Sequence, residues 1–320
     1  MKRTKYIIMT LVISILILSL MGCKKKDTDI EEQNINNEDN AEIESNVETG
    51  KEHMIAELEK LAELINNKLT DEAVEFVDRK IKDFTSIEGD EMVLKLQEML
   101  EKNIAKDNLF KDYEGELMEI AGDKLFFPKE KVGDIKDEKL REAIENAYKN
   151  RYKLINMEGQ FYPIVDYEQF KAYDNYVSSE VKDYIDIRAT MSNEPMAMDG
   201  ALTITYDQLG NRILKVEEYL KKYFQGKRYE EVLGFYEDWL WLYLNGAPNT
   251  PIADADTSTI YKDVFESYKK VANTADSTTA FVVNKYLNRI EGNKGVIDIS
   301  ILEDNGELVN EALSLLEASK

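Results

Sequence analysis

Apolar residues recur at helical spacing over most of the chain, and this pattern constrains the fold more than any other feature. The first series, Met54, Leu58, Leu61, Ile65 and Leu69, advances by three or four residues, which places all five side chains on one helix face. Glycine and proline number only 15 and 5 among 320 residues, whereas strand-rich folds need many turns. The sequence therefore predicts an all-α fold, a helical bundle or an array of helical hairpins, with at most minor β structure.

The C-terminal half contains two predicted pairs of helices. The first pair is Tyr206–Phe224 with Arg228–Leu244, and the second is Thr257–Val271 with Asp276–Ile290, where Asp276 is the expected N-cap. Within the first pair, Glu217-Glu218-Tyr219-Leu220-Lys221-Lys222-Tyr223 and Tyr229-Glu230-Glu231-Val232 resemble a tetratricopeptide-type hairpin. This resemblance implies two antiparallel helices joined by a short loop.

The chain begins with a cationic segment followed by an uncharged, largely apolar run. Lys2, Arg3 and Lys5 supply the charge, and Ile7–Met21 contains no charged residue. A helix needs about 20 consecutive apolar residues to cross a bilayer core, so this run is short for a membrane span. It matches the apolar region of a cleaved secretory signal, which has about 7–15 residues. The sequence therefore predicts a signal peptide over residues 1–22.

The apolar run ends at Leu20-Met21-Gly22-Cys23, which resembles the lipobox of bacterial lipoprotein signals. The resemblance implies cleavage before Cys23 and a diacylglycerol on its thiol, with fatty acids such as palmitate anchoring the chain stably. Cys23 is the only cysteine, so it has no disulfide partner in the chain. The Lys-, Asn- and Ile-rich composition also resembles that of helical lipoproteins of Gram-positive bacteria. The alternative is an uncleaved membrane helix that ends in a cysteine by chance.

The rest of the chain divides into four predicted segments. Residues 23–50 are rich in Glu, Asp and Asn without a periodic apolar pattern, which is typical of a disordered acidic linker. Residues 51–106 are expected to form a small helical bundle. Residues 107–136 contain three glycines and a proline and are expected to be an irregular connection. Residues 137–320 are expected to form a C-terminal helical domain.

Composition excludes several classes of function. With 63 acidic and 41 basic residues, the net charge is −22, and such a surface repels phosphate backbones, so nucleic acid is not an expected partner. His53 is the only histidine and Cys23 is expected to be lipidated, which excludes serine–histidine or cysteine–histidine catalysis and histidine- or cysteine-based zinc sites. We predict no catalytic residue, metal or cofactor. The enzymatic chemistry that remains is that of a carboxylate pair.

The most apolar stretch after the signal peptide lies at the end of the helix Arg228–Leu244. It contains Trp239, Trp241 and Tyr243 and is followed by a polar loop with Asn245 and Asn249. One interpretation is an aromatic platform for a sugar, a peptide or a partner helix. The alternative is packing of these rings within the core.

A second candidate region mixes glycine, proline and aromatic residues over Leu154–Tyr167, which is expected to be a loop with Tyr162 and Asp166 as polar tips. It either lines a pocket or fills the core. Arg188 occupies a core-facing position of the next helix, so it either pairs with Asp166, Asp199 or another neighbour or holds a ligand anion. We predict a binding site where the Trp239–Tyr243 helix end, the Asn245–Pro251 loop and the Phe161–Tyr167 loop converge, with Arg188 as a buried cation.

These features together favour a non-enzymatic binding module, held through lipidated Cys23 on the extracytoplasmic face of the cell membrane, at the cell surface. Its expected partner is a protein, a peptide or a glycan. Two alternatives remain open. One is a ligand-binding lipoprotein of a transport system, and the other is a carboxylate-dependent hydrolase of cell-wall glycan.

Overall fold

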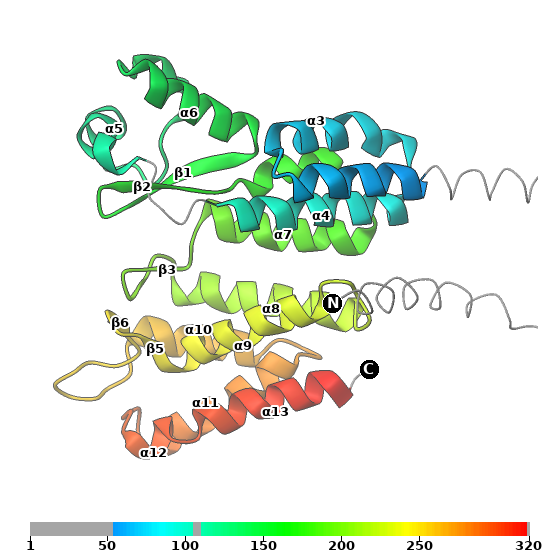
Figure 1. Ribbon diagram of the computed structural model, residues 1–320. Coiled ribbons are helices and arrows are strands. Elements are labelled where there is room, and N and C mark those ends of the chain that lie inside the picture. Colours follow the sequence, from blue (N-terminus) through cyan, green and yellow to red (C-terminus); the bar gives the residue numbers. More distant parts are fainter. Residues whose placement is uncertain (1–53, 105–109, 319–320) are drawn as a thin grey trace, which may run out of the picture. The chain divides into compact units, whose positions relative to one another are not determined.

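Figure 1 shows the computed structural model, which describes residues 54–104 and 110–318. These residues are mostly helical, with strands only in small two-stranded sheets, which confirms the all-α prediction. All of them belong to a single unit, Glu52–Lys320. The expected signal peptide, Cys23 and acidic linker lie outside the described residues. None of the helices in the described part is both long enough and apolar enough to cross a membrane.

The N-terminal part of this unit is a group of antiparallel helices. A helix over residues 54–66 precedes α3 (Thr70–Lys80), the short 3-10 helix η2 (Ile81–Asp83) and α4 (Ser86–Asn103). Thr85 caps α4, and the Glu88 carboxylate accepts a hydrogen bond from the Thr85 backbone N–H at 2.8 Å. This reciprocal arrangement is a capping box, which fixes where α4 begins.

One stretch that was expected to be a loop, Leu154–Tyr167, forms a β-hairpin over most of its length. β1 (Tyr152–Met157) pairs antiparallel with β2 (Gln160–Val165). The turn residues Glu158 and Gly159 both have positive φ, at 54° and 88°. Two positive φ angles are typical of the type I′ turn, whose twist matches that of the paired strands. The loop prediction was therefore wrong.

The hairpin packs with short helices that precede it. These are η3 (Lys111–Tyr113), α5 (Glu114–Ala121), η4 (Lys129–Asp134) and α6 (Glu138–Lys149). Their buried side chains form a hydrophobic cluster apart from the main core, here called the second cluster: Phe110, Leu117, Ala121, Phe127, Val132, Ile135, Leu140, Ile144, Tyr148, Leu154 and Phe161. Residues 107–136 were expected to be an irregular connection, and part of this stretch thus belongs to the second cluster.

The remainder of the chain consists of longer helices linked by short loops and two-residue strands. The helices are η5 (Tyr167–Tyr173), α7 (Ser179–Asn193), α8 (Tyr206–Lys222), α9 (Tyr229–Asn245), α10 (Lys262–Ala272), α11 (Thr278–Gly292), α12 (Ile299–Leu302) and α13 (Asn305–Ala318). The strands pair as two tight hairpins, β3 (Ala197–Met198) with β4 (Ala201–Leu202) and β5 (Gly246–Ala247) with β6 (Thr250–Pro251).

Five of these helices close into a ring, here called the C-terminal ring (Figure 1). α8 contacts α9, α9 contacts α13, α13 contacts α11, α11 contacts α10, and α10 returns to α8. The two predicted helix pairs are the α8–α9 and α10–α11 hairpins. A ring encloses one shared core, so this part is a bundle.

The C-terminal end of α9 lies inside the ring, and neighbouring side chains bind its last carbonyl groups. The Tyr268 hydroxyl on α10 donates to the Tyr243 carbonyl at 2.7 Å. The Leu244 carbonyl accepts from the Tyr286 hydroxyl on α11 at 3.0 Å and from the Asn305 amide at 3.3 Å. The last four carbonyls of a helix have no partner within it, so three other helices complete the end of α9.

The main hydrophobic core extends through almost the whole described unit. Its buried members run from Leu61 in the first described helix to Leu316 in α13. It therefore joins helices from residues 51–106 and from residues 137–320, the two predicted helical regions. The boundaries expected at 106 and 137 do not coincide with a break in this core.

Candidate binding site

Arg188 lies on α7 with its guanidinium group between two carboxylates. One Nη atom donates to Glu101 of α4 and the other to Glu231 of α9. The Arg188 side chain is only 16% exposed. Burial alone would lower the pKa of Arg188, but the tyrosine hydroxyls and carboxylates around it raise that pKa above its ordinary value. Arg188 was expected either to form an ion pair or to hold a ligand anion. These contacts form an ion pair, and the partners are two glutamates, neither Asp166 nor Asp199.

Hydrogen bonds extend this charged cluster across three helices. Glu101 also accepts from the Tyr167 hydroxyl, and Glu231 accepts from the Tyr184 hydroxyl at 2.8 Å. The guanidinium carbon lies 4.4 Å from the centre of the Tyr167 ring. A cavity of about 210 Å³ adjoins the cluster, and Arg188, Glu101 and Tyr167 form part of its wall. Buried charges that are paired in this way fix the relative positions of the elements that carry them.

Asp166 and Tyr162 find their partners close to the β1–β2 hairpin. Asp166 forms an ion pair with Lys153 of β1 at 3.4 Å. Burial lowers the pKa of the Lys153 ammonium group, while Asp166 opposes that shift. The Tyr162 hydroxyl donates to the Gln160 side chain on the same strand. Tyr162 lies within β2, and Asp166 directly follows that strand as the N-cap of η5, so neither residue is the tip of a loop.

The three aromatic residues near the end of α9 have different surroundings. Trp239 is 3% exposed and its ring stacks on Phe235 with centroids 6.0 Å apart. Tyr243 is fully buried and shares a 2.7 Å hydrogen bond with the Ser267 hydroxyl. Trp241 is 49% exposed. Of these three rings, Trp241 alone is largely open to solvent.

Of the two asparagines expected to rim the site, Asn245 directly precedes β5 and Asn249 lies in the β5–β6 turn. Asn245 ends α9, and its amide donates to the Trp241 carbonyl at 2.9 Å. The Asn249 amide donates to the Asp199 carbonyl at 2.7 Å, which ties the β5–β6 turn to the β3–β4 turn. Asn249 is thus exposed at a turn, next to the turn that contains Asp199.

The predicted residues come together only in part. Arg188 lies 5.5 Å from the centre of the Phe235 ring, and Phe235 stacks on Trp239, so these two predicted residues share a neighbour. Within residues 54–104 and 110–318, no hydrogen bond, ion pair or ring contact joins Trp241 or Asn249 to the β1–β2 hairpin. These contacts give no single cluster that contains all eight predicted residues.

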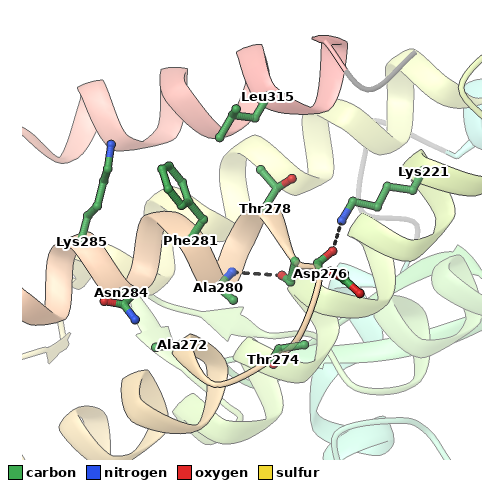
Figure 2. Close-up of a pocket in the computed structure, with 11 residues that line it drawn as sticks. Lys221, Ala272, Thr274, Asp276, Thr278, Ala280, Phe281, Asn284, Lys285 and Leu315 are labelled. Atoms are coloured by element: carbon green, nitrogen blue, oxygen red, sulfur yellow. Dashed lines mark hydrogen bonds between the residues drawn. The ribbon is translucent and has the colours of Figure 1, made fainter.

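The sequence did not predict a shallow groove of about 560 Å³ between α11 and α13. Figure 2 shows Phe281 and Leu315 pointing into the space between the two helices. Phe281 is 47% exposed, and the Lys285 ammonium group lies 4.6 Å from the centre of its ring. Phe281 is not among the buried residues of α11. In the sequence, an aromatic residue that lies off the apolar face of a helix was the signal that could have indicated this groove.

The floor of this groove is the start of α11. Ser277 is the N-cap of α11 and accepts a hydrogen bond from the Ala280 backbone at 3.0 Å, so the expected cap, Asp276, was wrong. Asp276 has a positive φ of 52°, and its carbonyl accepts from Lys221 (Figure 2). Buried Glu217 accepts from the Thr279 backbone at 2.9 Å. Hydrogen bonds from Lys221 and Thr279 lower the pKa of Glu217, against the effect of its burial.

Comparison with known proteins adds no family to this description. No family model matches the chain, and no curated protein or solved structure is similar to it. Among the described residues, no group of three or more His, Cys, Asp and Glu side chains is placed to hold a metal ion.

Proposed function

We propose that this chain is a lipid-anchored binding module on the extracytoplasmic face of the cell membrane, with a protein, peptide or glycan as its partner. The observation that carries the proposal is Leu20-Met21-Gly22-Cys23 at the end of an uncharged run with a cationic start. A diacylglycerol at Cys23 supplies the two acyl chains that stable anchoring requires.

The described unit supports the binding half of the proposal through its surface. Phe281 and Trp241, at 47% and 49% exposed, present large rings to solvent, and Phe281 lies in the groove of Figure 2. Exposed aromatic rings in concave regions are enriched where proteins bind partners. The net charge of −22 favours a partner that is neutral or basic.

The anchoring half is tested by replacing Cys23. We expect Cys23→Ala to abolish incorporation of labelled palmitate and to release the protein from membranes or leave it as an unprocessed precursor. Ser19→Ala, which leaves Leu20–Cys23 unchanged, is the matched control and should be lipidated normally. Labelling and membrane retention of Cys23→Ala at the level of the unsubstituted chain would refute the anchor.

The binding half is tested by crosslinking on intact membranes. A photoreactive residue at Phe281 should capture one reproducible species, whereas the same residue at Asn288, an exposed position elsewhere on α11, should not. Phe281→Asp should then weaken recovery of that species about tenfold, since it places a charge in an apolar contact. Equal capture from both positions would show that the groove is not the binding surface.

A further inference from the structure

A cavity of about 300 Å³ opens where the second cluster meets the main core, and we call it the polar cavity. Its walls come from the start of α3, the end of α4, one side of α6 and the β1–β2 hairpin. Its polar lining residues are Thr70, Asp71, Asn103, Asn146 and Asn150. Ligand pockets in proteins range from about 300 to 1,000 Å³, so this cavity suits a small molecule.

Asn150 is the most firmly held residue of this wall. It is the C-cap of α6 and its backbone N–H donates to the Asn146 carbonyl at 3.0 Å. The next residue, Arg151, has a positive φ of 62° and forms an ion pair with Asp78 of α3. Asn150 is only 5% exposed. Its backbone is therefore held at the end of α6, and its carboxamide contacts Asp71 of α3.

The carboxamide oxygen of Asn150 has no hydrogen-bond partner among the described residues. Its amide nitrogen donates to the Asp71 carboxylate. Because an ionised carboxylate only accepts hydrogen bonds, the nitrogen must face Asp71, and the oxygen cannot exchange places with it. Most buried polar atoms in proteins have a partner. Any group that satisfies the Asn150 oxygen must therefore be a hydrogen-bond donor.

The charge of the wall restricts which donor fits. Lysine and arginine are absent from the residues that line the polar cavity in the described part of the chain, while Asp71 contributes a carboxylate. The Asn103 amide nitrogen donates to the Thr70 hydroxyl at 3.2 Å, so one of its two N–H groups is already engaged within the wall. A ligand that complements such a wall supplies several donors and carries no negative charge.

The cavity lining also includes apolar residues and rings. Tyr152 and Pro163 lie there, and the Tyr152 hydroxyl is engaged by the Leu100 carbonyl at 2.9 Å, which leaves its ring as an apolar surface. A sugar combines hydroxyl donors with apolar C–H faces that pack on such rings. We propose that the polar cavity binds a small sugar, neutral or carrying an amine, with a hydroxyl donating to Asn150 Oδ1.

This inference goes beyond the proposed binding role, because the polar cavity and the groove at Phe281 share no lining residue. A monosaccharide has about a dozen non-hydrogen atoms, and a ligand of that size with few contacts binds with a dissociation constant of about 1 mM. Weak binding of this order is typical of single sugar sites and needs sensitive detection.

The experiment is a titration of the full chain, in a detergent without a sugar headgroup, with glucose, glucosamine and glucuronate. Isothermal calorimetry and ligand-observed NMR provide the readouts. We expect glucose and glucosamine to bind and glucuronate to bind at least tenfold more weakly, because its carboxylate meets that of Asp71. No binding of glucose or glucosamine at 50-fold the expected dissociation constant, or equal binding of glucuronate, overturns the proposal.

Two variants locate the site. Asn150→Leu removes the acceptor and should weaken binding about fivefold, the factor that corresponds to one hydrogen bond of about 1 kcal/mol. Asn146→Phe fills the cavity from the exposed face of α6 and leaves Asn150 in place, so it tests the site even if Asn150→Leu folds poorly. Asn288→Phe, at an exposed position on α11, is the control. If both cavity variants bind sugar like the control, the proposal is wrong.

The two proposals fail independently. Loss of sugar binding in the titration leaves the lipidation of Cys23 and the crosslinking from Phe281 untouched. Conversely, failure of lipidation or crosslinking leaves the sugar titration unchanged, because the titration needs neither an anchor nor a partner.

Discussion

The C-terminal ring and the second cluster are stabilised in different ways. The ring consists of helices of 11 to 17 residues whose buried tyrosines donate to backbone carbonyls of α9. The second cluster combines α5 and α6 with 3-10 turns and a hairpin around largely apolar side chains, with one such bond, from the Tyr148 hydroxyl to the Phe127 carbonyl at 2.8 Å. Hydrogen bonds are directional and burial of apolar surface is not. The ring is therefore specified helix by helix, whereas the cluster depends on its neighbours for support.

That support is visible where the second cluster joins the main core. Asn150 and Arg151, between α6 and β1, bind Asp71 and Asp78 on α3. Arg151 also lies over the Tyr173 ring, with its guanidinium carbon 4.8 Å from the ring centre. Small clusters bury too little surface to be stable alone. The comparison therefore predicts that the second cluster unfolds first and that the ring persists.

The largest expected effect comes from emptying the second cluster. Phe161 is fully buried and packs against Phe127 with ring centroids 5.9 Å apart. Phe161→Ala should lower the free energy of unfolding by about 3–5 kcal/mol, the usual cost of a large cavity in a core. Hydrogen exchange should show lost protection over residues 110–161 and retained protection in α8–α11.

Tyr162→Ala is the matched control, since Tyr162 is next in the strand and only half-buried. It should cost at most about 1 kcal/mol. If Phe161→Ala instead removed protection from the C-terminal ring as well, the two regions would form one cooperative unit and the contrast between them would fail.

A smaller effect concerns the response of the C-terminal ring to alkaline pH. Burial raises the pKa of Tyr286 to about 12, while the Asn305 amide opposes the shift. Below pH 10 this tyrosine is neutral in both states, so its contribution is fully present. Between pH 10 and 12 the unfolded chain loses the proton first, which removes about 3 kcal/mol of stability as pH rises through the folded value.

Burial also raises the pKa values of Tyr243 and Tyr268 in the ring, so the alkaline loss should be steep. Absorbance at 295 nm reports tyrosinate, and circular dichroism reports helix. We expect both signals to change together above pH 10. Ionisation of all 18 tyrosines before any helix is lost would contradict the buried hydroxyls of the ring.

The smallest effect tests one of the bonds that complete α9. Tyr286→Phe removes the donor to the Leu244 carbonyl, which keeps its hydrogen bond from Asn305. The expected cost is about 1 kcal/mol, the net value of one hydrogen bond. Urea unfolding should show a lower midpoint with an unchanged slope. Tyr261→Phe, at a 39% exposed position, should leave the midpoint where it is.

Features that depend on residues close in sequence could be predicted. The spacing of apolar residues identified the α8–α9 and α10–α11 pairs, because a helix face is set by neighbours three and four positions away. The same spacing placed Arg188 on a core-facing position and required a carboxylate partner. Glu158 and Gly159 carried a turn signal, but the aromatic residues and Pro163 around them obscured the strand pair.

Features that depend on distant residues could not be predicted. Arg188 pairs with Glu101 and Glu231, which are 87 and 43 positions away, and nothing local distinguishes these two from the other acidic residues. The convergence of Trp241, Asn249 and Tyr162 was an assumption about such distances, and no contact between the described residues joins the three. The unpartnered oxygen of Asn150 likewise exists only because Asp71 lies beside its amide.

The completion of α9 by three later helices also sets an order in time. The donors to the carbonyls of Tyr243 and Leu244 lie 25, 42 and 61 positions farther along the chain. While the polypeptide is being made, the end of α9 must stay hydrated or frayed until α10, α11 and finally Asn305 have emerged. A ribosome that stalls before residue 305 therefore leaves a chain whose most apolar helix is unfinished, and such a chain exposes the surface that quality-control proteases and chaperones bind.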